Sequence, residues 1–250
     1  MYATIKQIKS EAKEKLLSNM WTAVFFTIFY ISITNICSFC LMVVPSGGSI
    51  ADLLFYELTT LMIHLFTGIL QMGVAAFYLK SSTGNELPSL SDLFYAFSHG
   101  PDRALKVSFI FALIHMICTL PYIIYTLFLM PSYTLENLMA LDPGVIKSMG
   151  FAYLLLGIGE LVYFLICLSF DPVYFMLVDM PGLSAMKAMK MSLWLMKGSK
   201  VRLLGLYLSF LPLQFISLLT FGIGNLWVTP YMNLSAAQFY TDLSAKRTNQ

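Results

Sequence analysis

Residues 220–240, TFGIGNLWVTPYMNLSAAQFY, decide how many times this chain can cross a membrane. The stretch is apolar enough to enter a bilayer, but it contains two glycines, a proline, two asparagines and a glutamine. Extended to 222–243 it is long enough to span, because about 20 mostly apolar residues cross the hydrocarbon core. Glycine and proline are tolerated in such helices where neighbouring helices satisfy the freed backbone groups. The rest of the sequence has to decide whether this segment spans.

The composition excludes an ordinary water-soluble fold. Of 250 residues, 58% are hydrophobic and 11% are charged, whereas soluble domains carry about 25% charged residues. The mean hydropathy is +0.75. So few charges cannot cover the surface of a soluble protein of this length, and lipid must be the solvent for most of it. We therefore predict an all-α fold, a polytopic membrane helical bundle formed by a single integral membrane domain over residues 1–250.

Five other stretches are long and apolar enough to span, and they cover residues 21–44, 53–79, 107–130, 149–178 and 201–221. Lysine and arginine distinguish five spans from six, because cytoplasmic segments hold the excess of these residues. With six spans and both termini inside, 14 of the 15 basic residues lie in the cytoplasm. Five spans would place Lys246 and Arg247 outside. We predict six transmembrane helices in a cell membrane, with 222–243 as the sixth.

Three cytoplasmic segments have the pattern of amphipathic helices, and they cover residues 5–17, 89–97 and 183–196. The expected apolar faces are Ile5, Ile8, Ala12 and Leu16 in the first and Leu183, Met186, Met189 and Leu193 in the third. Basic amphipathic helices commonly lie in the membrane interface, but packing beneath the bundle explains the pattern equally well. In the interfacial case the residues expected to contact anionic lipid are Lys187, Lys190, Lys197 and Lys200.

Polar side chains within the spans are the candidate functional residues, because an ionisable group is costly inside a bilayer. Glu57, His64 and Gln71 are spaced by seven residues, about two helical turns, and therefore share one face of the second span. Counting depth from the cytoplasmic ends at about 1.5 Å per residue places His64 near the level of Glu160. These four residues form the predicted midplane polar site.

The same count of depth predicts a second pair nearer the cytoplasm, formed by His115 and Asp171. Carboxylate–histidine pairs occur in proton relays. The alternative is that both pairs are interhelical hydrogen bonds that only hold the bundle together. Asp171 has a further interpretation, because it precedes Pro172 near the membrane boundary and is suited to cap a kink there.

Patterns of known enzymes are missing from the sequence. It contains no HExxH, no GxSxG and no phosphate-binding loop. Cys37 and Cys40 form a CxxC inside an apolar segment, where small buried hydrophobic residues are the better interpretation. Gly157 and Gly159 also lie inside a span, where they favour close helix contact. Three histidines without a tight cluster predict no metal site, and we expect no cofactor and no catalysis. The basic residues fit anionic lipid better than nucleic acid.

Several motifs together resemble a known family. They are IKQIKSEAKEKL at 5–16, FDPVYFMLVDMP at 170–181, LSAMKAMKMSLWLMKGSK at 183–200, GIGNLWVTPY at 222–231 and FYTDL at 239–243. In these the chain resembles the bacterial integral-membrane family filed as domain of unknown function 975. More distantly, it is similar to the membrane domain fused to some glycerophosphodiester phosphodiesterases. The resemblance implies a polytopic bacterial membrane protein and carries no activity with it.

Two classes of function stay open. The first is a non-enzymatic integral membrane protein that acts through membrane lipid or through partner membrane proteins. The second is a small transporter or flippase with a polar site near the midplane, where His64 and Glu160 are predicted. We expect contact with anionic lipid on the cytoplasmic side in either case, because the basic residues gather there.

Overall fold

A computed structural model of the chain describes residues 2–42, 50–84, 86–129 and 142–248. Within these ranges the secondary structure is helical and contains no strand. Four long apolar helices dominate, and they are α2 (Met20–Met42), α3 (Ile50–Thr83), α5 (Pro101–Ile124) and α7 (Pro143–Cys167). A short π-helical segment, η2 (Tyr125–Leu129), continues α5. The all-α fold class is confirmed.

Five helical segments in the described part of the chain are long and apolar enough to cross a membrane. Four are the long helices, and the fifth is Lys200–Leu219, which joins α10 (Lys200–Leu208) to α11 (Leu211–Leu219). The protein is therefore a multi-pass membrane protein by length and composition. The last helix, α12 (Asn225–Thr248), is not among the five because polar side chains dilute its hydropathy.

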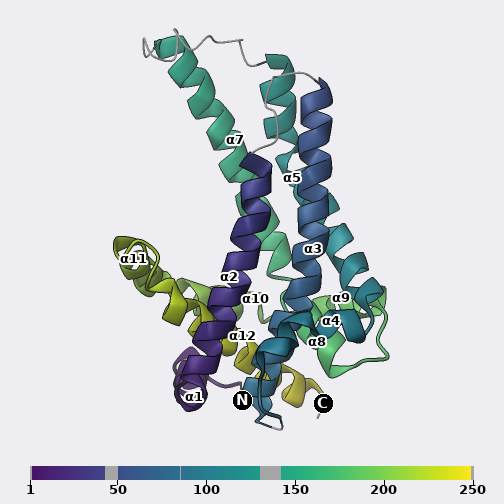
Figure 1. The fold of residues 1–250 in the computed structure, drawn as a ribbon, viewed down its shortest axis with the longest axis vertical. Helices are drawn as coiled ribbons and strands as arrows, with labels where there is room; N and C mark the ends of the chain where they lie inside the picture. Colours follow the sequence, from purple (N-terminus) through teal and green to yellow (C-terminus); the bar gives the residue numbers. More distant parts are fainter. Residues whose placement is uncertain (1, 43–49, 85, 130–141, 249–250) are drawn as a thin grey trace.

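The molecule has two halves with different surroundings. In Figure 1, α2, α3, α5 and α7 run toward one end, and both chain termini lie at the opposite end. The extended half presents large apolar side chains such as Phe39, Leu58 and Ile117 on its surface. In the other half, α12 packs against α1, α2 and α3, and its residues 234–240 are buried on every side. A helix surrounded by protein does not need an apolar surface.

The first of the three predicted segments lies within a helix. It is α1 (Ile5–Ser18), and a capping box between Thr4 and Gln7 begins it. Ile8 and Ala12 are fully buried against the core, and α1 packs on α12. The second segment forms a short 3-10 helix, η1 (Leu90–Phe94), followed by α4 (Tyr95–Ser98).

The third predicted amphipathic segment contains α9 (Ala185–Leu195), which buries only part of the predicted face. Its buried residues are Ala185, Ala188, Met189, Ser192 and Leu195. Met186 and Leu193 of the predicted stripe are exposed instead. Met189 of the predicted stripe is buried, and the small residues Ala185, Ala188 and Ser192 beside it let α9 lie close to α5, α8 (Val173–Asp179) and α12.

Two of the predicted spans are not continuous helices. The segment predicted as 149–178 breaks at Cys167, passes through turns at 168–172 and resumes as α8. Pro172 explains this break, because proline removes a backbone donor and clashes with the preceding turn. The segment predicted as 201–221 changes direction between α10 and α11, and α11 projects sideways from the rest of the molecule (Figure 1). Lys9 of α1 donates to the carbonyl and hydroxyl oxygens of Ser209 at this bend, both at 3.1 Å.

Candidate functional site

A partly open cavity of about 410 Å³ lies where α3, α5, α7, α8, α10 and α12 meet. Its wall carries polar groups from His64 and Gln71 of α3, from Asp171 in the break, and from Asn233 of α12. The volume falls within the range of about 300–1,000 Å³ that is usual for small-molecule sites. These segments are far apart in sequence, so the cavity exists only in the folded bundle.

The break between α7 and α8 places a carboxylate in the cavity wall. Asp171 lies in the turns at 168–172, and the hydroxyl of Tyr207 on α10 donates to its Oδ1 at 2.5 Å. The sequence prediction paired Asp171 with His115, and that pairing is wrong. The interpretation that Asp171 stands beside a kink at Pro172 agrees with the position of the break.

Four tyrosines, Tyr78, Tyr163, Tyr174 and Tyr207, contribute aromatic rings to the wall. The hydroxyl of Tyr174 lies 3.0 Å from Ser108 Oγ. Because Ser108 gives its own hydrogen to the carbonyl of Ala104, Tyr174 must be the donor. The hydroxyl of Tyr78 is similarly 3.3 Å from Thr27 Oγ1. These contacts, together with that of Tyr207, fix the positions of three rings.

A glycine permits the contact between α3 and α5 beside the cavity. A Cβ atom placed at Gly68 would lie 1.5 Å from Ser108 Oγ and 3.2 Å from the hydroxyl of Tyr174. No larger residue fits without moving the serine that holds this ring. Gly68 therefore belongs to the construction of the cavity wall.

Beside the cavity, the three residues His64, His115 and Glu160 form one cluster. Nε2 of His115 is 2.9 Å from Oε1 of Glu160. The ring centroids of His64 and His115 are 5.2 Å apart. His64 lines the cavity, while the Glu160 side chain is 48% exposed at the outside of the bundle. The cluster thus connects the cavity wall with the outer surface.

His115 was predicted to pair with Asp171 but contacts Glu160, and this difference has a geometric cause. The count of depth began at residue 107, but α5 begins at Pro101, so His115 lies about 9 Å farther along its helix than predicted. It also treated 149–178 as one straight helix, although α7 ends at Cys167. In the structure His115 contacts both Glu160 and His64.

The two other predicted midplane residues lie on the same helix as His64. Gln71 lines the cavity, and its Nε2 donates to the hydroxyl of Tyr30 at 2.9 Å. Glu57 is half-buried and close enough to His115 to interact with it electrostatically. The shared face predicted from the spacing of seven residues therefore points toward one polar region.

The predicted lipid-contact residues lie on the surface. Lys187, Lys190, Lys197 and Lys200 are all exposed. Trp194 on α9 is 53% exposed, and the guanidinium of Arg247 lies 4.8 Å from its ring centroid. Arg247 also donates to the backbone oxygen of Trp194 at 2.6 Å. Exposed apolar and basic side chains therefore alternate on the outer face of α9.

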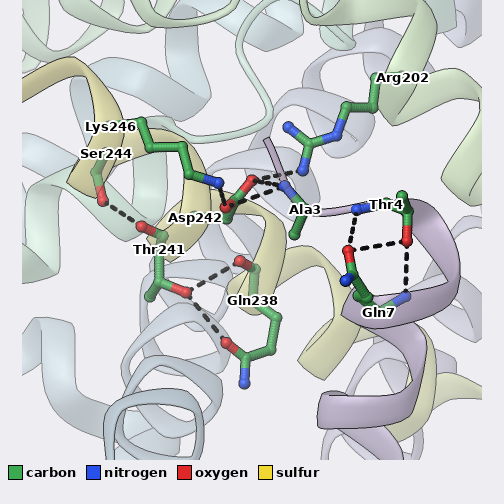
Figure 2. A network of polar contacts seen from close by, with 9 residues as sticks. All are labelled: Ala3, Thr4, Gln7, Arg202, Gln238, Thr241, Asp242, Ser244 and Lys246. Atoms are coloured by element: carbon green, nitrogen blue, oxygen red, sulfur yellow. Dashed lines mark hydrogen bonds and ion pairs between the residues drawn. The ribbon is translucent and has the colours of Figure 1, made fainter. Parts of the chain in front are cut away.

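The sequence reasoning missed a charged network that joins the two ends of the chain. Asp242 on α12 accepts hydrogen bonds from the backbone N–H of Ala3, from Arg202 Nη2 at 2.5 Å and from Lys246 (Figure 2). Its side chain is 13% exposed. The spacing of Asp242 and Lys246 by four residues was the available signal, but Ala3 and Arg202 are distant in sequence.

Ligands for a metal ion are not gathered anywhere in the described ranges. No group of three or more histidine, cysteine, aspartate or glutamate residues in these ranges is arranged to hold one. The four cysteines are free thiols, and Cys167 lines the cavity.

The close helix contact expected at the glycines is confirmed for Gly159, where a Cβ would lie 2.6 Å from the backbone oxygen of Cys118. Gly157 has open space around it.

Comparison with known proteins identifies the family. The profile of the family described as "Protein of unknown function (DUF975)" matches residues 1–247, and the chain belongs to this family. The resemblance to domain of unknown function 975 is thereby confirmed. No curated protein and no solved structure matches the chain significantly. The family description carries no activity, so function has to follow from the cavity and the charges.

Proposed function

We propose that this protein is a small membrane transporter that binds a polar solute in the cavity between α3, α5, α7, α8, α10 and α12. The observation that supports it most is the polar cavity beside the break at 168–172. Irregular backbone at membrane depth is tolerated where it is buried in protein or lines a water-filled space. Transporters often form their substrate sites from such interrupted helices. The mechanism requires no catalytic group and no cofactor.

The His64, His115 and Glu160 cluster supplies a candidate proton path for this transporter. It runs from the cavity wall to a half-exposed carboxylate at the outer surface. Ionisable residues inside membrane bundles commonly form such relays. A proton arriving at Glu160 would pass to His115 and then toward His64, and so couple the charge of the wall to the solute.

We further propose six spans, with α12 as the sixth and both termini in the cytoplasm of a bacterial cell. The polar residues of α12 do not oppose a span, because the helix is largely enclosed by neighbours and Asn233 faces the cavity. Cysteine tags at Gly84 and Gln250 should react from the cytoplasmic side, and a tag at Ser46 from the outside. Ser46 and Gln250 lie outside the described residues. An outward-facing Gln250 would refute the six-span arrangement.

The outer face of α9 is proposed to contact anionic lipid headgroups on the cytoplasmic side. Its exposed lysines and the exposed Met186, Leu193 and Trp194 give it the mixture of charge and apolar surface that interfacial helices have. The opposite face of α9 packs into the core. The helix is therefore suited to both roles that the sequence left open.

The test of the cavity uses Cys167 as a reporter. With Cys37, Cys40 and Cys118 replaced by serine, a neutral water-soluble methanethiosulfonate reagent is applied to membranes that contain the protein. We expect Cys167 to be modified, because a solute site must be reached by water. If Cys167 reacts only after the protein is denatured, and a Thr67→Cys reporter in the same wall behaves alike, the cavity is closed to solutes and the transporter proposal fails.

A further inference from the structure

The charge of the cavity wall selects the sign of its ligand. Among the described residues that line the cavity, Asp171 carries the one carboxylate and His64 the one imidazole, and none is a lysine or arginine. The hydroxyl of Tyr207 supplies one hydrogen bond to the carboxylate. A carboxylate has lone pairs for about four such contacts. An anionic solute would meet uncompensated repulsion here, whereas a cation would complete the charge balance.

The aromatic side chains in the wall select the kind of cation. Phe170 lies in the same turns as Asp171, Tyr174 lies in the first turn of α8, and both line the cavity. Phe111 lies between them from α5, with ring centroids 5.9 Å from Phe170 and 6.2 Å from Tyr174. Faces of aromatic rings attract alkylammonium and quaternary ammonium groups. A carboxylate beside several fixed rings is therefore a suitable site for such a group.

A bare metal ion is a poorer occupant than an organic cation. Hard cations such as Ca²⁺ take six to eight oxygen ligands at short distance. The described wall offers one carboxylate, one imidazole and one thiol together with amides, hydroxyls and rings, and no three such ligands in the described ranges are grouped to hold a metal ion. Its volume of about 410 Å³ also exceeds what a single ion with a few waters fills. Size and chemistry both favour a molecule with an apolar body and one positive charge.

We propose that the cavity binds a small organic monocation, an alkylammonium or quaternary ammonium compound, with Asp171 as its counter-ion and the surrounding rings as its apolar cage. This inference rests on the proposed transport function and names the chemical class of its substrate. Tyr207 positions Asp171 through its hydrogen bond, and Tyr174, held by Ser108, forms part of the cage.

The test is protection of Cys167 in the single-cysteine protein by a charged probe. Tetraethylammonium should slow modification of Cys167 by the neutral reagent, and ethanesulfonate, an anion, should not. Asp171→Asn should weaken the protection about tenfold or more, because the buried cation loses its charged partner. The matched control is Asp179→Asn: Asp179 also accepts a hydrogen bond from a tyrosine, Tyr240, at 2.8 Å, but it does not line the cavity. In this control variant, tetraethylammonium should protect Cys167 as well as it does in the parent protein.

The outcomes separate this inference from the transport proposal. Cys167 could react while tetraethylammonium gives no protection or ethanesulfonate protects equally. Either result would refute an organic cation as the ligand but would still show that water reaches the cavity. Equal protection in the Asp171→Asn and Asp179→Asn variants would refute Asp171 as the counter-ion. If Cys167 and the Thr67→Cys reporter are both unreactive in the membrane, the transport proposal itself fails. Size-exclusion profiles identify variants that have lost the fold, and Asp171→Glu, which keeps the charge, then replaces Asp171→Asn and must retain protection.

Discussion

Gly159→Ala tests the packing that holds the polar cluster together. A Cβ at this position would lie 2.6 Å from the backbone oxygen of Cys118, although ordinary contacts begin near 3.4 Å. The obstructing atom belongs to the backbone of α5 and cannot rotate away, so α5 and α7 must separate by about 0.8 Å or distort locally. Glu160 follows directly on α7, so the 2.9 Å contact with His115 would lengthen as well.

The expected magnitude follows from comparison with a neighbouring glycine. Overpacking a well-filled contact costs about 1–3 kcal/mol, while replacing glycine by alanine inside a helix contributes about 0.5–1 kcal/mol of stability. Gly157→Ala has only the second effect, because nothing lies within 4 Å of its new Cβ. The gain in helix propensity is common to both variants. The difference between them therefore isolates the packing cost, about 1–3 kcal/mol.

The assay is thermal unfolding of the two variants and the parent protein in the same detergent. We expect Gly157→Ala to melt at or above the parent temperature and Gly159→Ala clearly below it. If Gly159→Ala is as stable as Gly157→Ala, the close contact between α5 and α7 does not exist as described. Equal destabilisation by both would show that glycine is needed at these positions for another reason.

Three further experiments with substituted proteins test separate parts of the structure. Asp242→Ala leaves the buried guanidinium of Arg202 without its carboxylate and should destabilise the protein by about 3 kcal/mol. Asp102→Ala removes an exposed ion pair and should cost under about 1 kcal/mol in the same melting assay. Equal losses would contradict the network in Figure 2. Glu160→Gln keeps a hydrogen-bond acceptor for its histidine neighbour, so stability should fall by only about 0.6 kcal/mol while the pH dependence of solute uptake is lost; an unchanged pH profile would leave the cluster a structural contact. In an isolated 183–196 peptide, replacing Lys187 and Lys190 by glutamate should weaken binding to anionic vesicles by about 1 kcal/mol per lysine. If the substituted peptide binds as well as the original one, the interfacial contact is excluded.

The long helices were predictable because apolar length alone specifies them. The predicted segments 21–44 and 53–79 correspond to α2 and α3 with ends that differ by a few residues. The breaks were harder to see. Pro172 and Pro212 are both visible in the sequence, but proline also occurs inside continuous membrane helices, as Pro121 does in α5. Which proline interrupts a helix depends on neighbours that satisfy the freed backbone.

The buried face of α9 was predicted only in part, for a related reason. Met189 is buried as expected, but Met186 and Leu193 are exposed, and alanine and serine lie beside Met189 because neighbouring helices approach closely. Hydrophobicity by itself does not report how much room a neighbour leaves. In a membrane protein an outward apolar residue is also stable, so the usual contrast between a polar outside and an apolar inside is weak.

The candidate site was predicted by residue type and only partly by arrangement. His64, His115 and Glu160 were singled out because ionisable groups are rare in spans. The aromatic wall of the cavity was not predicted, because its tyrosines are scattered over α3, α7, α8 and α10 and have no spacing in common. A cavity assembled from six segments is a property of their packing, and a sequence pattern records only the contribution of each one.

Uptake of radiolabelled tetraethylammonium into proteoliposomes tests the central claim most directly. The purified protein is reconstituted with an inside-negative membrane potential, and initial uptake is measured over a range of probe concentrations. A cavity that binds and carries an organic cation predicts saturable uptake above that of protein-free vesicles. The uptake should be abolished by Asp171→Asn and retained by Asp179→Asn. Uptake that equals the protein-free background, from protein that is folded and inserted, would contradict the account.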